Sequence, residues 1–150
     1  MDIRKLGEGE RPPMELLLNA DPSRQLVEGY LQRGECYVAV ISDGIIGVYV
    51  LLPTRPATVE LVNVCVHDDY QGKGIGKRLV QHAVQQARED GYQTIEVGTG
   101  NSGVGQLALY QKCGFRMVGI DRDFFLRHYE EALFENGIQV LDMVRLSQDL

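Results

Sequence analysis

The sequence lacks any long apolar segment, since no run in its 150 residues approaches the roughly 18 to 20 apolar residues that span a bilayer. The opening residues, MDIRKLGEGERPP, also lack the apolar core of a secretory signal. We therefore expect neither a membrane span nor export. A chain of this length, with 44% hydrophobic residues, is typical of one globular domain covering residues 1–150.

Cysteine is scarce as well. The three cysteines, Cys36, Cys65 and Cys113, lie far apart in the sequence and form no C-x-x-C pair. They predict neither a disulfide framework nor a zinc site, and separate thiols suit the reducing cytoplasm. The three histidines show no metal-ligand spacing either, so we expect no metal.

Positive charge is in deficit, with a formal net charge of −6. This balance argues against nucleic acid as the main partner. The cations Lys73, Lys77 and Arg78 therefore form a local positive group on an acidic background. Such a distribution suits a confined anion site, and the acidic surface could attract a cationic amine.

That local group belongs to the stretch around which the chain is organised, ELVNVCVHDDYQGKGIGK, residues 60–77. Its apolar, β-branched part, residues 61–66, predicts a mostly buried strand. A polar turn and three glycines follow, at the head of a strongly helical segment. Glycines and the unpaired N–H groups of a helix start make a site for phosphate oxygens. Residues 71–76 are thus predicted to cradle a phosphate-bearing ligand.

Spacing excludes two common phosphate loops. A P-loop requires G-x-x-x-x-G-K-[ST], but Gln71 and Arg78 occupy the first and last of these positions, which leaves no hydroxyl for magnesium. A dinucleotide fingerprint requires a third glycine where Lys77 stands, and the glycines come too late in the chain for an opening βαβ unit.

The rest of the pattern predicts a mixed α/β sheet in one domain, in the order ββ, strand–helix, strand–helix, ββ. Asp21-Pro22 is typical of a helix start, and Asp43-Gly44 of a hairpin turn. We expect strands at 2–6, 36–41, 45–52, 61–66, 94–98, 115–120 and 138–146, and helices at 14–18, 22–33, 76–90, 104–113 and 124–135.

Two motifs in this order resemble the GNAT superfamily of N-acetyltransferases. The first is Q-x-x-G-x-G, here Gln71, Gly74 and Gly76, and the second is Asn101 followed by residues 109–115, LYQKCGF. The resemblance implies a bacterial-type, single-domain α/β (α+β) fold. Its mostly antiparallel central sheet would be flanked by helices, and a splayed central strand pair would form an acetyl-CoA cleft.

The resemblance also implies that acetyl-CoA, or coenzyme A, binds as a co-substrate without a metal. In the family a pyrophosphate loop and the backbone of the central strand hold this molecule, and Asn101 would contact its pantetheine arm, although capping the helix from 104 is an equal alternative. The implied cofactor-binding residues are Val64, Cys65, Val66, Gln71, Gly72, Lys73, Gly74, Ile75, Gly76, Lys77 and Asn101.

For catalysis the resemblance points to Tyr110 as the general acid that protonates the leaving thiolate. A phenol has an ordinary pKa of about 10, close to that of a thiol. Glu60 corresponds to a general base found in family members that acetylate lysines, and it would act through water. His67 and Glu96 are weaker candidates for acid–base roles.

The implied enzyme transfers acetyl from acetyl-CoA directly to a primary amine of a small molecule or protein in the cytoplasm. The alternatives are a non-catalytic acyl-CoA-binding sensor or regulatory module and a binder of another nucleotide phosphate. The acceptor stays open among a polyamine, an aminoglycoside-like molecule, another small amine and a protein amino group. The aromatic segment 121–137 could line the acceptor side, form a homodimer contact or be plain core.

Overall fold

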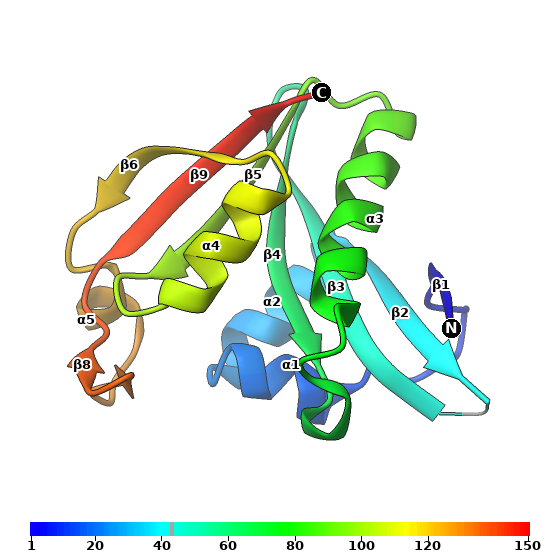
Figure 1. Ribbon diagram of the computed structural model, residues 1–150, viewed down its shortest axis with the longest axis horizontal. Helices are drawn as coiled ribbons and strands as arrows, with labels where there is room; N and C mark the ends of the chain where they lie inside the picture. Colours follow the sequence, from blue (N-terminus) through cyan, green and yellow to red (C-terminus); the bar gives the residue numbers. More distant parts are fainter. Residues whose placement is uncertain (43) are drawn as a thin grey trace.

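The computed structural model describes residues 1–42 and 44–150, which form one seven-stranded sheet with helices on both faces and a small separate hairpin (Figure 1). The strands are β1 (Asp2–Lys5), β2 (Glu35–Ile41), β3 (Gly44–Arg55), β4 (Thr58–Val66), β5 (Thr94–Gly100), β6 (Arg116–Asp121), β7 (Phe134–Glu135), β8 (Ile138–Gln139) and β9 (Met143–Asp149). The helices are α1 (Met14–Ala20), α2 (Arg24–Arg33), the 3₁₀ turn η1 (Asp68–Tyr70), α3 (Ile75–Glu89), α4 (Val104–Lys112) and α5 (Phe124–His128).

The strand order in the main sheet is β1-β2-β3-β4-β5-β9-β6. Every neighbouring pair is antiparallel except β4 and β5, which run parallel with α3 as their crossover. This arrangement confirms the predicted mixed, mostly antiparallel sheet.

β4 and β5 pair over only part of their length. Their register runs from Thr58 opposite Thr94 to Leu61 opposite Val97, and then the strands diverge (Figure 1). Beyond that point each strand stays paired on its outer side only, β4 with β3 as far as Val66, and β5 with β9. The sheet therefore opens into a V at its centre, as the resemblance implied.

The helices bury an apolar layer on each face of the sheet. On one face α3 packs Leu79, Ala83 and Ala87 against the sheet, and all three side chains are fully buried. This is the helical stripe that the sequence predicted. On the other face Leu17 of α1 and Val27 of α2 cover the middle of β2 and β3.

Two predicted helix caps were wrong, although α4 begins at Val104 as predicted. Ser23, not Asp21, caps α2, because its hydroxyl accepts a hydrogen bond from Leu26 N at 3.2 Å. The Asp21 carboxylate is used elsewhere, as described below. At α4 the N-cap is Gly103 and no side chain caps the helix, so the capping role considered for Asn101 is also wrong.

The C-terminal third departs furthest from expectation. The helix predicted over 124–135 ends at His128, and the chain then forms the β7–β8 hairpin. Asn136 and Gly137, predicted as a helix stop, instead turn this hairpin with φ values of 55° and 74°. The predicted strand 138–146 is divided between β8 and β9. The turn predicted at Asp43-Gly44 involves Asp43, which lies outside the described residues.

No helix within residues 1–42 and 44–150 is both long and apolar enough to cross a membrane. The same residues contain no group of three or more His, Cys, Asp or Glu side chains placed to hold a metal ion.

Candidate functional site

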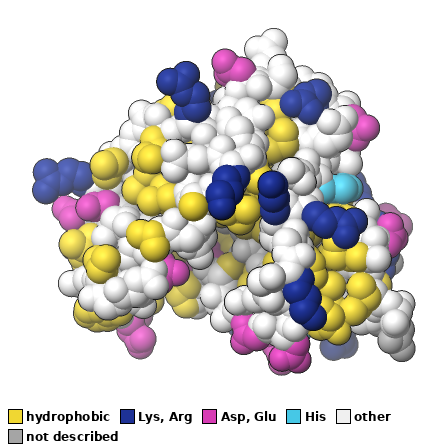
Figure 2. All heavy atoms as spheres, viewed as in Figure 1, with side chains coloured by type: hydrophobic (Ala, Val, Ile, Leu, Met, Phe, Trp, Pro, Cys, Tyr) yellow, Lys and Arg dark blue, Asp and Glu magenta, His cyan; other side chains and the backbone are white. Residues whose placement is uncertain are grey.

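A cavity of about 770 Å³ occupies the V between β4 and β5. Figure 2 shows a hollow between the two halves of the molecule, with Lys and Arg side chains above it over the α3–α4 region. The cavity has the size of a small-molecule site. The predicted residues that line it are Val64, Cys65, Val66, Gln71, Gly72, Gly74, Ile75, Gly76 and Tyr110.

The loop before α3 presents unpaired backbone donors at one end of this cavity. Gly72 and Gly74 have φ values of 75° and 80°, a left-handed conformation that favours glycine. The first N–H of the helix with a backbone acceptor belongs to Arg78, which donates to Gly74 O at 3.2 Å. Each N–H from Gly72 to Lys77 lacks a partner among the described residues. The loop therefore fits a pyrophosphate.

Side chains of the loop support this arrangement from outside. The Gln71 amide donates to Val66 O at 3.2 Å and to Asp68 Oδ1 at 3.3 Å, so it ties the loop to the end of β4. Lys73 lies with Nζ 5.4 Å from the centre of the Tyr70 ring. Among the described residues that line the cavity, neither Lys73 nor Lys77 appears. Their charge can attract an anion to the loop without closing on it.

β4 carries a β-bulge at the point where it separates from β5. Val50 of β3 pairs with Asn63 and Leu51 pairs with Leu61, so Val62 is left without a partner. Beyond the bulge, the side of β4 that faces β5 has no strand opposite it. Free backbone groups along Val64–Val66 can pair with an extended, amide-bearing ligand as another strand would.

Tyr110 of α4 faces the cavity across from Val64–Val66 of β4. Its side chain is 5% exposed, and its ring packs edge-on against Phe115 with the ring centres 6.0 Å apart. Within residues 1–42 and 44–150 its hydroxyl has no hydrogen-bond partner. Burial, with a smaller effect from Cys113, raises the pKa of Tyr110 to about 12. The hydroxyl is thus a protonated donor available to a ligand.

Glu60 lies on β4 outside the cavity lining that the described residues form. Its strand neighbour in the parallel register is Glu96. Burial raises the pKa of Glu60, Arg145 opposes that effect, and Glu96 adds to it. Glu96 itself is paired with Arg55. Among the described residues, Glu60 therefore has no ion-pair partner, whereas Glu96 has one. Glu60 would act on a ligand in the cavity through an intervening water.

Two other candidates have structural contacts. His67 Nδ1 accepts from Asp69 N at 3.1 Å and so caps the 3₁₀ turn. Asn101 Oδ1 accepts from Leu141 N at 2.8 Å and Asp142 N at 3.0 Å, while its amide donates to Gln139 O at 3.1 Å. The Asn101 side chain therefore holds the segment between β8 and β9, and neither residue is among the described residues that line the cavity.

The cavity lining also includes polar residues for which the sequence predicted no joint role. Asp21, Tyr30, Asn63 and Tyr129 all line it and are joined by hydrogen bonds. Tyr129 lies 108 residues from Asp21 in the chain, so only the fold brings them together. One local signal was present: Asn63 is a polar residue within an otherwise apolar strand run.

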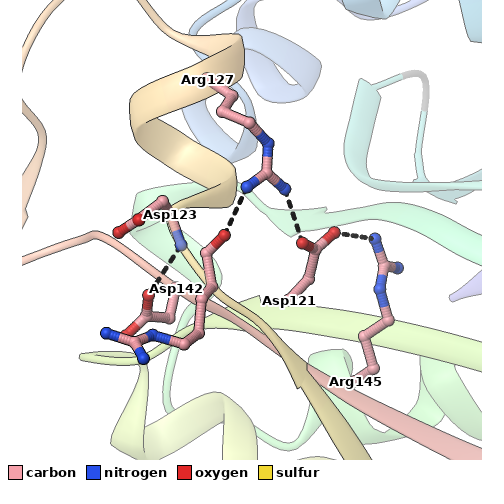
Figure 3. Close-up of polar contacts among 6 residues, drawn as sticks. Asp121, Asp123, Arg127, Asp142 and Arg145 are labelled. Atoms are coloured by element: carbon pink, nitrogen blue, oxygen red, sulfur yellow. Dashed lines mark hydrogen bonds and ion pairs between the residues drawn. The ribbon is translucent and has the colours of Figure 1, made fainter.

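Ion pairs fix the segment that carries Tyr129 (Figure 3). Arg127 of α5 bonds Asp121 Oδ1 and the carbonyl of Arg122, both at 2.6 Å, and Arg145 of β9 lies 3.4 Å from the other Asp121 oxygen. Arg145 also stacks its guanidinium 5.6 Å from the centre of the Phe124 ring. The aromatic segment thus lines the cavity through Phe124, Phe125, Tyr129 and Phe134.

Comparison with known proteins identifies the fold. A model of the Acetyltransferase (GNAT) family matches residues 5–115. The uncharacterized N-acetyltransferase YvbK of Bacillus subtilis (strain 168) is 58% identical over 147 residues, covering 97% of this chain and 95% of that protein. A Bacillus subtilis acetyltransferase crystallised with CoA is 57% identical, with a TM-score of 0.91 and 99% of both chains covered. A GNAT family acetyltransferase from Elizabethkingia anophelis with acetyl-CoA bound is 42% identical, with a TM-score of 0.97 over 99% of this chain and 97% of that one.

Proposed function

The chain belongs to the GNAT family of acetyltransferases and is an acetyl-CoA-dependent N-acetyltransferase, and we propose that it acetylates a primary amine by direct transfer. The observation that carries the proposal is the cavity in the V. Among the described residues, the loop before α3 presents N–H groups without a partner, and Tyr110 presents a hydroxyl that makes no protein hydrogen bond. Bound acetyl-CoA supplies the activated thioester, so the chain itself need only bind, orient and move protons.

The loop from Gly72 to Lys77 would bind the pyrophosphate through its N–H groups. The free edge of β4 along Val64–Val66 would pair with the pantetheine amides, and a backbone N–H on that edge would polarise the thioester carbonyl. Each of these roles uses the main chain. They depend on the bulge and the divergence of the strands more than on side-chain identity.

Two side chains would move the protons. The attacking amine loses one proton to Glu60 through water, and the departing thiolate sulfur gains one from the Tyr110 hydroxyl. A C–N bond forms and the C–S bond breaks. Burial of Glu60 supports the first role, because a carboxylate with a raised pKa is a stronger base.

A thiol-release assay with acetyl-CoA and a panel of amines tests the reaction. We expect free thiol to appear with one class of primary amine and not with the corresponding alcohols. CoA binding with no turnover on any amine would contradict the proposal and favour the non-catalytic module.

Arg145→Gln should move the acidic limb of the pH profile of kcat/KM to higher pH. Arg145 lowers the pKa of Glu60, and the base is active only when ionised, so removing the arginine raises the pH at which activity appears. Initial rates measured across the pH range, with wild type alongside, check this.

Arg88→Gln is the matched control, because it removes the same charge from an exposed position on α3. Its acidic limb should coincide with that of wild type. An unmoved limb in Arg145→Gln would remove Glu60 from the mechanism and favour a chain of waters as the base.

We also propose a cytoplasmic homodimer. The dimer is supported by the edge strand β6, on which Met117, Val118 and Ile120 are 54%, 61% and 65% exposed. The cytoplasmic location is supported by the three cysteines, which form no disulfide among the described residues. Light scattering on the purified protein should give twice the chain mass. A monomer mass at micromolar concentration would contradict the dimer.

A further inference from the structure

The polar end of the cavity is built around one carboxylate. Asp21 Oδ1 accepts from Tyr129 OH at 2.8 Å and from Ser23 N at 3.1 Å, and Oδ2 accepts from Tyr30 OH at 3.2 Å. Asn63 completes the group by donating its amide to Tyr30 OH at 2.8 Å and to Leu17 O at 3.0 Å. We name Asp21, Tyr30, Asn63 and Tyr129 the carboxylate cluster.

One atom in this cluster has no partner. Asn63 is 4% exposed, and its Oδ1 is the only buried side-chain N or O atom without a hydrogen bond in the described parts of the chain. Buried polar atoms are nearly always paired, and leaving one unpaired costs about 1–3 kcal/mol. Asn63 lines the cavity, and a shift of its side chain would bring this oxygen to a hydrogen-bond donor bound there.

The cluster also carries negative charge that no cation offsets. Among residues 1–42 and 44–150, no Lys, Arg or His nitrogen lies within ion-pair distance of Asp21. The hydroxyls of Tyr30 and Tyr129 both donate hydrogen bonds to Asp21, and burial raises the pKa of each, so the two tyrosines stay neutral. What the cluster offers a ligand is acceptors: the carboxylate, Asn63 Oδ1 and the second lone pair of the Tyr129 oxygen.

We propose that the carboxylate cluster binds a second, non-reacting ammonium group of the acceptor, which makes the acceptor a small aliphatic diamine or polyamine. The proposal rests on the proposed amine acetylation. An ammonium group has several N–H donors, and its positive charge would pair with the Asp21 carboxylate, which has no cationic partner among the described residues. It would not be the reacting nitrogen, because a carboxylate partner stabilises the protonated form, whereas attack requires the neutral amine.

Aromatic side chains beside the cluster suit a methylene chain. Phe124 and Phe125 line the cavity, and the Phe125 ring centre lies 5.4 Å from that of Tyr129. Apolar rings beside a buried carboxylate match an acceptor with a hydrocarbon spacer between two nitrogens. A protein lysine carries one side-chain amino group, which the reaction itself consumes, so it would bring no second ammonium group to the cluster.

The test compares 1,4-diaminobutane with 1-aminobutane, which differ only in the second amine. Wild type should acetylate the diamine with kcat/KM about 10- to 100-fold higher, since a charge-assisted hydrogen bond has this effect. Asp21→Asn should raise KM for the diamine by a similar factor and change KM for the monoamine less than threefold. The ratio of the two substrates within one variant is independent of how much enzyme is correctly folded.

Tyr129→Phe should shift the same ratio less, because the carboxylate remains. Asp149→Asn is the control for net charge, since it removes a carboxylate at an exposed strand end outside the cavity. It should leave the ratio unchanged.

A binding measurement separates this inference from the reaction. Calorimetry with 1,4-diaminobutane and CoA-loaded protein should detect binding that Asp21→Asn loses. Absent diamine binding to wild type, or an equal effect of Asp21→Asn on both amines, would overturn the cluster's role even if amines are acetylated. Diamine binding without turnover would support the cluster and contradict the proposed reaction.

Discussion

Replacing Tyr110 with phenylalanine is expected to lower kcat about 100-fold while the Kd for CoA changes less than about twofold. The hydroxyl makes no hydrogen bond to any described residue, so its removal disturbs no protein hydrogen bond, and the ring that packs against Phe115 is kept. Only the proton donated to the leaving thiolate is lost. Steady-state kinetics with an accepted amine and calorimetry with CoA measure the two quantities.

Burial limits this effect. The pKa of Tyr110 is raised to about 12, further from the pKa of a thiol, about 8.5, than a free phenol would be. The same apolar surroundings also disfavour the thiolate and so raise the pKa of the thiol, which narrows the difference between the two pKa values. We therefore expect an effect at the lower end of the general-acid range, and no loss of activity from Tyr110 ionisation below about pH 11.

Tyr37→Phe is the matched control. Tyr37 is 6% exposed in the same apolar core, stacks on Tyr49 with ring centres 4.8 Å apart, and lies outside the cavity that the described residues form. Its variant should keep kcat within about twofold. If both variants lose activity equally, Tyr110 contributes packing and not a proton.

Replacing Gly74 with valine is expected to weaken CoA binding by about 5- to 150-fold. At φ 80° a β-branched residue is strained by about 1–3 kcal/mol, and the loop can relieve that strain only by leaving the conformation that aims its N–H groups at the cavity. A Cβ added at Gly74 meets no atom of the described residues within 4 Å, so the effect comes from the backbone conformation. Calorimetry with CoA checks it.

Gly91 is the matched control, because valine at this position would be strained in the same way at the other end of α3. It has φ 89°, and an added Cβ again meets no atom of the described residues within 4 Å. Gly91→Val should lower the melting temperature about as much as Gly74→Val and leave the Kd for CoA unchanged. Equal losses of CoA affinity in both would show that helix stability, and not the loop, governs binding.

The local structure of the loop that we propose as the pyrophosphate site was predictable, because its parts are contiguous in the sequence. A strand, a glycine turn and a helix start are contiguous, and their geometry follows from residues 61–76 with little help from the rest of the chain. The side-chain details were less predictable. Gln71 and Asn101 proved to hold backbone segments in place, and no pattern in the sequence distinguishes such a contact from one to a ligand.

The arrangement of the residues that we propose as the acceptor site was not predictable from local sequence pattern. Phe125 and Tyr129 stand four residues apart and favour a helix, but tertiary contacts end α5 at His128 and direct Tyr129 to Asp21. Glu60 shows a similar limit. The resemblance implied that Glu60 is a base acting through water, but the sequence does not show that Glu60 pairs along β5 opposite Glu96 and lies outside the lining that the described residues form.

The position of β9 in the sheet makes the pairing of β6 depend on the last strand of the chain. β9 is inserted between β5 and β6, so β6 has no neighbour in the main sheet until the last strand of the chain arrives. The part built from β1 to β5 and α1 to α3, which includes the loop from Gly72 to Lys77, can form before β9 and β6 pair. A folding intermediate could then bind the donor before any acceptor pocket exists, and until β9 inserts it would expose the unpaired edge of β5 to aggregation.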